Sequence, residues 1–400
     1  MNPSIKKLAE TALKKRKTII GLMSGTSLDG LDIALCTIEG NGENTSVQLQ
    51  EFLTSPYTGE EKKQLRSISS VETASLKSIC YLHTWLADIH SKKILDALDR
   101  WNIKPELIDC IASHGQTIYH YPAREQLQEN EKFNTTLQIG DGDHIARKTG
   151  ILTLSDFRQK HTAAGGEGAP MAAQADRYLF RDTDEPRILL NIGGIANFTY
   201  LPKAGQDSNK IFTTDTGPGN TLIDRLAQTY FDLEYDEDGK KSAGGNINDE
   251  LLQALLSDNY FSIAKPETTG PERFNISWIE KKAKEKGLDI GKISPEDQMR
   301  TLTELSAVTI VGRIKKVTGD ETVPVYVSGG GMHNPVLMER IKNHLGHSEV
   351  YSIEKLGMNP DAKEAVVFAV LANEMLSGKG FKLQSYADAR INFGKISFPE

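Results

Sequence analysis

TIIGLMSGTSLDGLDIALC, residues 18–36, contains an apolar strand, a turn of small polar residues and a second apolar strand. The turn holds residues 25–27 and Gly30, whose backbone N–H groups and hydroxyls can close around phosphate oxygens. Asp29 and Asp32 fit beside a phosphate when a cation lies between them. The stretch therefore favours a phosphate-binding hairpin, with an ordinary hairpin and a polar turn as the alternative.

Length and composition set the class of protein around this hairpin. The 400 residues are enough for two domains, and 25% charged with 38% hydrophobic residues is typical of a globular chain. A net charge of −7 argues against a nucleic-acid surface. We find no apolar run long enough to span a bilayer and no signal peptide, so we expect a cytoplasmic protein with neither a membrane nor a nucleic-acid partner.

Cysteine and histidine spacing does not match a metal site. Nine histidines occur without an HExxH motif or a Cys/His cluster, so we expect no zinc site. His83 and His90 are expected as surface neighbours, seven residues apart on a helix. We expect three buried free thiols, Cys36, Cys80 and Cys110. Their unpaired spacing suits a protein of a reducing compartment.

Strands alternate with helices along the chain, which predicts an α/β protein with sites at strand ends. The strand 187–191, the turn Gly193-Gly194 and the strand 195–201 repeat the pattern of the first hairpin and indicate a duplicated domain. We expect a first domain over residues 1–162, completed by 380–400, and a second over 163–379.

Three glycine turns follow apolar strands, at residues 24–30, 215–220 and 328–331. One such turn is more often a plain connection, but three in one chain favour close approach of a ligand to the backbone. A P-loop is absent, because no Gly-x-x-x-x-Gly-Lys-Ser/Thr sequence occurs. A Rossmann fingerprint is also absent, because Gly217 and Gly219 lack a third glycine at the required spacing. Asn334, followed by proline, is expected to cap a helix.

Four polar residues are candidates for chemistry. Asp215 is expected at a strand end, where a rigidly held carboxylate can accept a proton, with turn capping as an equal alternative. His114 follows a strand among small polar residues, which favours hydrogen bonding to a substrate. For Asp156 a structural ion pair is slightly favoured over catalysis, and for Glu364 helix capping is the simpler interpretation.

Seven stretches together resemble the anhydro-N-acetylmuramic acid kinase family. They are GLMSGTSLDGLDIAL (21–35), ASHGQTI (112–118), DFR (156–158), AAGGEGAP (163–170), LNIGGIANF (190–198), DTGPGN (215–220) and SGGGMHNP (328–335). The resemblance implies a two-domain actin-like (ribonuclease H-like) sugar-kinase fold with ATP in an interdomain active-site cleft. It also implies Mg²⁺, an anhydrosugar substrate, a role in bacterial cell-wall sugar recycling, and compatibility with a homodimer.

The resemblance assigns a role to each matching segment. Asp215 matches the family's catalytic base, which activates water for attack on the anomeric carbon, and Glu364 is a second catalytic residue. The expected sugar-binding residues are His114, Gln116, Thr117 and Arg158. The expected nucleotide-binding residues are Gly25, Thr26, Ser27, Leu28, Asp29, Gly30, Leu31, Asp32, Gly193, Gly194, Gly217, Gly329, Gly330, Gly331 and Asn334.

The sequence departs from the family pattern at three positions. Glu167 and His161 replace a common Gln and Asp, and Pro271 interrupts a Thr-Gly-Arg-Glu pattern. These changes lie near the expected sugar pocket, so they bear on substrate identity. Levoglucosan kinase is therefore an alternative to the preferred anhydromuramic kinase, and a non-catalytic actin-like nucleotide-binding regulator is a second alternative.

Overall fold

The computed structural model describes residues 1–25, 27–123, 126, 130–169, 171–206, 210–263, 269–270, 273–319, 321–382 and 390–400. Thr26 and Pro271, both named above, lie outside the described residues. The chain forms two compact units, Met1–Leu179 with Ala362–Glu400, and Phe180–Asp361. Among the described helices, none is both long and apolar enough to cross a bilayer.

The first unit is built on a seven-stranded sheet in its described part, with the order β14-β6-β4-β1-β2-β3 and β5 paired to β4. Its strands are β1 (Arg16–Ser24), β2 (Gly30–Glu39), β3 (Ser46–Pro56), β4 (Cys110–Tyr121), β5 (Thr135–Ile139), β6 (Thr153–Ser155) and β14 (Lys395–Ser397). Its helices are α1 (Pro3–Leu13), α2 (Gly59–Arg66), α3 (Leu76–Arg100), α4 (Gly142–Thr149), α5 (Phe157–Ala163), α6 (Ala172–Phe180) and α13 (Lys363–Ser377). A short ribbon pairs β12 (Phe381–Lys382) with β13 (Arg390–Ile391).

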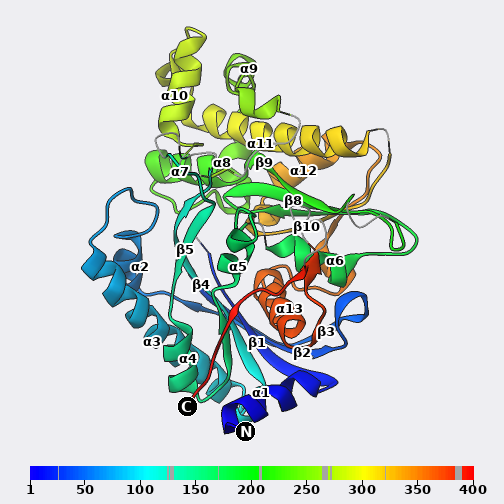
Figure 1. Ribbon diagram of the computed structural model, residues 1–400. Helices are drawn as coiled ribbons and strands as arrows, with labels where there is room; N and C mark the ends of the chain where they lie inside the picture. Colours follow the sequence, from blue (N-terminus) through cyan, green and yellow to red (C-terminus); the bar gives the residue numbers. More distant parts are fainter. Residues whose placement is uncertain are drawn as a thin grey trace. The chain divides into compact units, whose positions relative to one another are not determined.

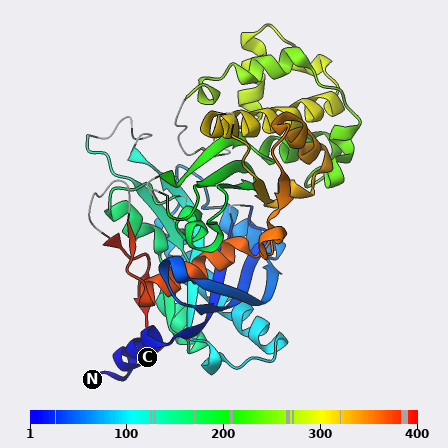
Figure 2. The ribbon, with the colours of Figure 1, turned by 90° about the vertical axis from the view of Figure 1, so that its right-hand side faces the viewer.

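Helices cover both faces of this sheet, so β1 is buried almost throughout. Ile20 and Leu22 share a core with Leu82 of α3. Gly21, between them, points the opposite way and lies directly against Ala365 of α13, where any side chain would collide with the helix backbone. Helix α13 rests on β1 and β2 in both views (Figures 1 and 2).

The second unit has a five-stranded sheet in its described part, with the order β11-β10-β7-β8-β9. Its strands are β7 (Arg187–Ile192), β8 (Ile195–Leu201), β9 (Phe212–Pro218), β10 (Val325–Ser328) and β11 (Val350–Ser352). Its helices are α7 (Thr221–Phe231), α8 (Lys240–Ala243), α9 (Asp249–Leu256), α10 (Ile276–Glu285), α11 (Pro295–Thr318) and α12 (Pro335–Leu345). One core joins the sheet to α11 and α12, and another joins α7, α9, α10 and α11.

The two sheets share one connectivity. In each, three consecutive strands pair antiparallel, as β1-β2-β3 and β7-β8-β9 do. The first strand of each trio then pairs parallel with a later strand, β4 or β10, which pairs parallel with the next, β6 or β11. This repeated order confirms the duplication that the sequence indicated.

The observed division differs from the expected boundaries after residues 162 and 379. Helix α13 belongs to the first unit because it packs on β1, β2 and β4. Helix α6 is tied to α13 by an ion pair between Asp176 and Lys363, both buried, at 3.3 Å. The chain therefore leaves the first unit later, and returns to it earlier, than we expected.

Candidate active site

The turn after β1 is supported from beneath by Gln116 of β4. Its Nε2 donates to the carbonyl oxygens of Gly25, at 3.2 Å, and Thr117, at 3.3 Å. Its Oε1 accepts from Ser24 Oγ at 2.5 Å. Gln116 is 0% exposed, so its side chain supports the turn and does not reach solvent. A direct sugar contact by Gln116 stays a prediction that this burial does not favour.

Ser24 connects Gln116 to a buried pair of aromatic side chains. Ser24 Oγ lies 2.9 Å from Tyr57 Oη, which lies 2.7 Å from His90 Nε2. The two carbonyls facing Gln116 Nε2 fix the orientation of that amide, so the Ser24 proton must go to Oε1. Tyr57 therefore donates to Ser24, and His90 Nε2–H donates to Tyr57.

His90 is 0% exposed, so its expected place on the surface is wrong. It lies on the apolar face of α3, where its ring packs near that of Tyr57. Burial, with a smaller effect of Lys93, lowers the pKa of His90 to about 3. The imidazole is thus neutral at physiological pH.

The three cysteines differ in burial. Cys36 and Cys110 are buried, as expected, whereas Cys80 is exposed, contrary to expectation.

The rest of the turn presents a few groups outward. Ser27 and Asp29 are exposed, and Asp32 Oδ1 accepts from Thr54 Oγ1 at 2.6 Å. Leu28 and Leu31 belong to the core, so only their backbone groups can face a ligand. The turn can therefore offer backbone amides, a hydroxyl and carboxylates.

Gly25 and Gly30 are glycine for different reasons. A Cβ on Gly30 would lie 2.6 Å from the Ser55 carbonyl oxygen, so packing against β3 requires glycine there. A Cβ on Gly25 would meet only Ser27 Oγ, at 3.7 Å. Among the described residues of the first unit nothing crowds Gly25, so its backbone is open to an atom of a ligand.

A second polar cluster in the first unit joins His114, Arg158 and Glu364. Arg158 Nε donates to His114 Nε2 at 3.0 Å, and Arg158 Nη1 donates to the Gly168 carbonyl at 2.9 Å. His114 Nδ1 donates to the Gly115 carbonyl at 2.9 Å, which fixes the tautomer. His114 lies inside β4, because the strand runs on to Tyr121, and not after the strand as expected.

The charges of this cluster follow from its burial. Burial, and then the Arg158 charge, hold the pKa of His114 well below its usual range. Burial also lowers the pKa of Arg158 to about 10, which the charge of Glu364 partly offsets. His114 is therefore a neutral acceptor that orients a cationic Arg158.

Glu364 stands at the first turn of α13. Desolvation raises the pKa of its carboxyl group, and Lys363 and Arg158 oppose this effect. The side chain is nevertheless exposed, and contact with water limits the size of the shift. The cluster thus combines a rigid guanidinium with a carboxylate that solvent or a substrate can reach.

Thr117 and Asp156 form their polar contacts with residues outside this cluster. Thr117 is partly exposed and its Oγ1 accepts from Gln138 Nε2 at 3.1 Å. Asp156 forms an ion pair with Lys395 of β14. The favoured structural interpretation of Asp156 is therefore confirmed, with a partner that the sequence did not suggest.

Asp215 lies within β9, because the strand continues to Pro218, and not at its end as expected. Its side chain is partly exposed. Asp215 Oδ2 accepts a hydrogen bond from the backbone N–H of Thr269 at 2.8 Å. This amide orients the carboxylate, as a positioned general base requires.

The glycines of the second unit divide in the same way as Gly25 and Gly30. Gly329 and Gly331 are required by packing, since a Cβ on either would lie within 2.8 Å of Ile192. Gly217, at φ +133°, would meet Phe261. In contrast, Cβ atoms on Gly193, Gly194 and Gly330 would meet no atom of the described residues nearer than 3.5 Å. These last three positions fit a ligand lying against the backbone.

The turn between β7 and β8 is fixed to the start of α7. The carbonyl of Gly193 accepts from the N–H of Asn220, and the carbonyl of Gly194 accepts from those of Gly219 and Thr221. These three amides are therefore occupied within the unit. Asn334 is also engaged, because its Oδ1 caps α12 by accepting from Val336 and Leu337 N–H at 3.1 Å each, as expected of a cap.

No group of three or more His, Cys, Asp or Glu side chains that could hold a metal occurs within the described residues. Mg²⁺ commonly uses one or two carboxylates, with phosphate oxygens and water as further ligands. Asp29 and Asp32 beside the turn fit that requirement.

Sequence reasoning missed the buried partners of the site. Tyr57, His90 and Lys363 act on the turn or on Glu364 from positions far away in the chain. Tyr57 directly follows β3, and no local pattern marks it. The only available signal was His90, a polar residue on the apolar side of a helix.

The repeated sheet order, with a glycine turn after the first strand of each sheet, is typical of a two-domain actin-like fold. The model of the family "Anhydro-N-acetylmuramic acid kinase" matches residues 17–392. The chain belongs to this family.

Curated relatives agree over the whole length. Anhydro-N-acetylmuramic acid kinases from Pseudoalteromonas translucida and Pseudoalteromonas atlantica are 44% and 45% identical, each with 100% of both chains covered. The one from Caldanaerobacter subterraneus is 37% identical, covering 96% of this chain and 98% of the relative.

Solved structures show a weaker likeness. The activator of the 2-hydroxyisocaproyl-CoA dehydratase from Clostridium difficile, with bound ADPNP, has a TM-score of 0.43 at 13% identity, covering 90% of this chain and 95% of its own. A ROK family glucokinase from Streptomyces griseus has 0.37 at 10%, covering 88% and 98%. At these scores the likeness carries no conclusion about activity.

Proposed function

We propose that this chain opens the 1,6-anhydro ring of 1,6-anhydro-N-acetylmuramic acid and phosphorylates O6 with ATP, giving N-acetylmuramic acid 6-phosphate. The observation that carries the mechanism is Asp215, a partly exposed carboxylate oriented by the Thr269 amide. Membership of the kinase family supplies the reaction class.

Asp215 accepts a proton from a water molecule whose oxygen attacks the anomeric carbon. The bond between that carbon and O6 breaks, and O6 attacks the γ-phosphorus of ATP, from which ADP leaves. A fixed base and a fixed sugar make the attack intramolecular in effect, which is the main source of acceleration for such a reaction.

Side chains of the first unit supply sugar contacts in this proposal. Arg158, held by His114 and the Gly168 carbonyl, donates to sugar hydroxyls or to the lactyl carboxylate. Glu364 accepts from a hydroxyl or from the attacking water. Thr117 offers a partly exposed hydroxyl.

Backbone groups hold the nucleotide. Gly25 lies against phosphate oxygens, and Gly193, Gly194 and Gly330 lie against the remainder of ATP, because their Cβ positions are open. Asp29 and Asp32 would hold Mg²⁺, which neutralises phosphate charge when bound. We also propose a cytoplasmic location and a homodimer, the latter testable by light scattering.

Substrate identity is tested by ADP release with anhydro-N-acetylmuramic acid and levoglucosan in parallel. We expect turnover with the first sugar, because the curated relatives carry its name and do not favour the levoglucosan or regulator alternatives. Turnover with levoglucosan alone would reverse the preference, and none with either sugar would reject the kinase.

The base is tested with Asp215→Asn. We expect kcat to fall by roughly 10³-fold or more, because the amide accepts no proton from water, while ATP binding by calorimetry stays unchanged. Asp249→Asn, at an exposed position of α9, serves as the control and should keep normal turnover. Near-normal turnover of Asp215→Asn would remove Asp215 from the mechanism.

A further inference from the structure

Asp258 lies near the start of the loop between α9 and α10, residues 257–275, which contains Thr269; residues 264–268 and 271–272 of this loop lie outside the described part of the chain. Asp258 lies two residues after Leu256, the last residue of α9, and is 8% exposed. Its Oδ1 accepts from the backbone N–H of Tyr260 at 3.0 Å, which caps the short 3₁₀ helix at the beginning of the loop. The carboxylate is thus part of the near end of this loop.

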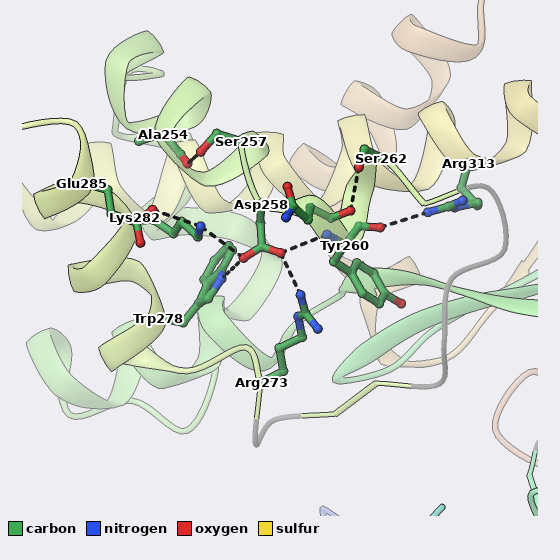
Figure 3. A network of polar contacts seen from close by, with 11 residues as sticks. Ala254, Ser257, Asp258, Tyr260, Ser262, Arg273, Trp278, Lys282, Glu285 and Arg313 are labelled. Carbon is green, nitrogen blue, oxygen red and sulfur yellow. Dashed lines mark hydrogen bonds and ion pairs between the residues drawn. The ribbon is translucent and has the colours of Figure 1, made fainter. Parts of the chain in front are cut away.

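The same carboxylate holds the far end of the loop. Its Oδ1 accepts from Arg273 Nη2 at 2.8 Å, and its Oδ2 accepts from Trp278 Nε1 at 2.9 Å with Lys282 Nζ at 3.5 Å. Figure 3 shows these donors converging on Asp258 from the loop and from α10. One anion therefore ties together residues on both sides of Thr269.

A short path leads from Arg273 to the proposed base. The backbone N–H groups of Arg273 and Phe274 donate to the carbonyl of Gly270 at 3.1 and 3.2 Å. Gly270 directly follows Thr269, whose N–H donates to Asp215 Oδ2 at 2.8 Å. Each step is a hydrogen bond or a single peptide link, so a displacement of Arg273 reaches the amide on Asp215.

Further contacts fix the near end of the loop against α11 and β9. Arg313 Nη1 donates to the Ile263 carbonyl at 2.5 Å, and Lys316 Nζ donates to the Phe261 carbonyl at 2.9 Å. The Phe261 ring lies where a Cβ on Gly217 would approach within 2.8 Å. Since Gly217 is two residues after Asp215, the loop contacts the strand of the base directly.

Asp258 is charged throughout the physiological range. Burial acts to raise its pKa, but hydrogen bonds from Trp278, Tyr260 and Arg273, with the Arg273 charge, outweigh burial and lower the pKa to about 2. Arg273 follows the segment in which this sequence departs from the family pattern at Pro271.

We propose that Asp258 is a positioning residue for the kinase reaction, holding the Thr269 loop so that the amide orients the Asp215 carboxylate. The inference rests on the proposed role of Asp215. Asp258 itself touches neither the sugar nor ATP in this proposal.

The test is Asp258→Asn, which keeps the size of the side chain and removes its charge. We expect kcat to fall roughly ten- to a hundredfold, with KM for ATP within about twofold, because a displaced base slows the chemical step and leaves nucleotide binding intact. The acidic limb of the kcat–pH profile should move to higher pH, because a weakened Thr269 hydrogen bond stabilises the carboxylate less.

Glu304→Gln is the matched control. Glu304 is a buried carboxylate of the same unit, 4% exposed, which pairs with Arg340 at 2.5 Å and His344 at 2.7 Å on α12. Its loss should lower Tm without changing the kcat–pH profile. Equal losses of kcat in the two variants, with unchanged pH profiles, would overturn the positioning role in favour of general destabilisation.

Arg273 offers a second variant in case Asp258→Asn does not fold, because its side chain is 40% exposed. Arg273→Gln should lower kcat, and Arg273→Lys should recover part of it. Normal kcat in Arg273→Gln, or in folded Asp258→Asn, would overturn the positioning role alone. Normal kcat in Asp215→Asn would instead overturn the base, so the two failures are distinguishable.

Discussion

Single buried side chains carry much of the chemistry of the first unit. His90 and His114 are both neutral, and each has one ring nitrogen hydrogen-bonded to a polar side chain, that of Tyr57 or Arg158. Neutral imidazoles can accept or donate in fixed directions without adding charge. The free energy of unfolding therefore falls in acid, because both rings bind a proton more readily in the unfolded chain than in the folded protein.

His90→Gln is expected to reduce this sensitivity to acid. The pKa of His90 is about 3 when folded and about 6.5 when unfolded, so the unfolded state binds more protons below pH 6.5 and the free energy of unfolding falls as pH drops. By pH 5 the loss is about 2 kcal/mol for this residue. Glutamine still offers an N–H to Tyr57 but does not titrate.

Urea unfolding at pH 7 and pH 5 checks this expectation. The decrease in unfolding free energy between the two pH values should be smaller in His90→Gln than in the wild type. His347→Gln, at an exposed position of the second unit, should keep the wild-type decrease. An equal decrease in all three proteins would contradict the role assigned to His90.

At the scale of the element, the glycines of one turn differ in whether packing requires them. The 3₁₀ helix Gly330–His333 begins with an exposed glycine, Gly330, and continues with a buried one, Gly331. Packing requires only Gly331, which lies against Ile192. The sequence SGGG shows three identical residues, and their different roles depend on what surrounds each of them.

Gly330→Ala and Gly331→Ala should therefore differ. Gly330→Ala should weaken ATP binding, measured as Kd by calorimetry, and leave Tm unchanged, because the new methyl group enters the open space in which we propose that ATP binds. Gly331→Ala should lower stability by about 1–3 kcal/mol through collision with Ile192. Unchanged ATP affinity in Gly330→Ala would show that the nucleotide does not approach this glycine.

At the scale of the whole molecule, the first unit is formed by two separate segments of the chain and the second by one. The second is continuous, and its two cores draw only on residues within 180–361. The first needs α13 to cover β1 and β14 to pair with β6. Insertion of one unit into the other explains why the expected boundaries were wrong.

A fragment of residues 180–361 is expected to fold alone. It should show cooperative urea unfolding and a helical circular dichroism spectrum, because its cores are complete. Residues 1–179 alone should not unfold cooperatively, since the α13 face of β1 would be exposed. A cooperative transition for 1–179, or none for 180–361, would contradict this division.

Sequence alone determined the strands around residues 18–36, the duplicated α/β pattern and the family. Apolar strands flanked by glycine turns are local patterns, and long motifs such as GLMSGTSLDGLDIAL are too specific to arise by chance. It also marked Asp215 as a candidate base. Helix capping by Asn334 followed from the adjacent proline for the same local reason.

Tertiary structure decided what each of these residues contacts. It placed Gln116 beneath the turn, buried His90, joined Arg158 to His114, and brought Thr269 and Asp258 to the support of Asp215. Such contacts join positions tens or hundreds of residues apart, and hydrogen bonding between buried groups produces no repeating pattern in the sequence. Their identity is set by which side chains the packed sheets and helices bring within about 3 Å of each other.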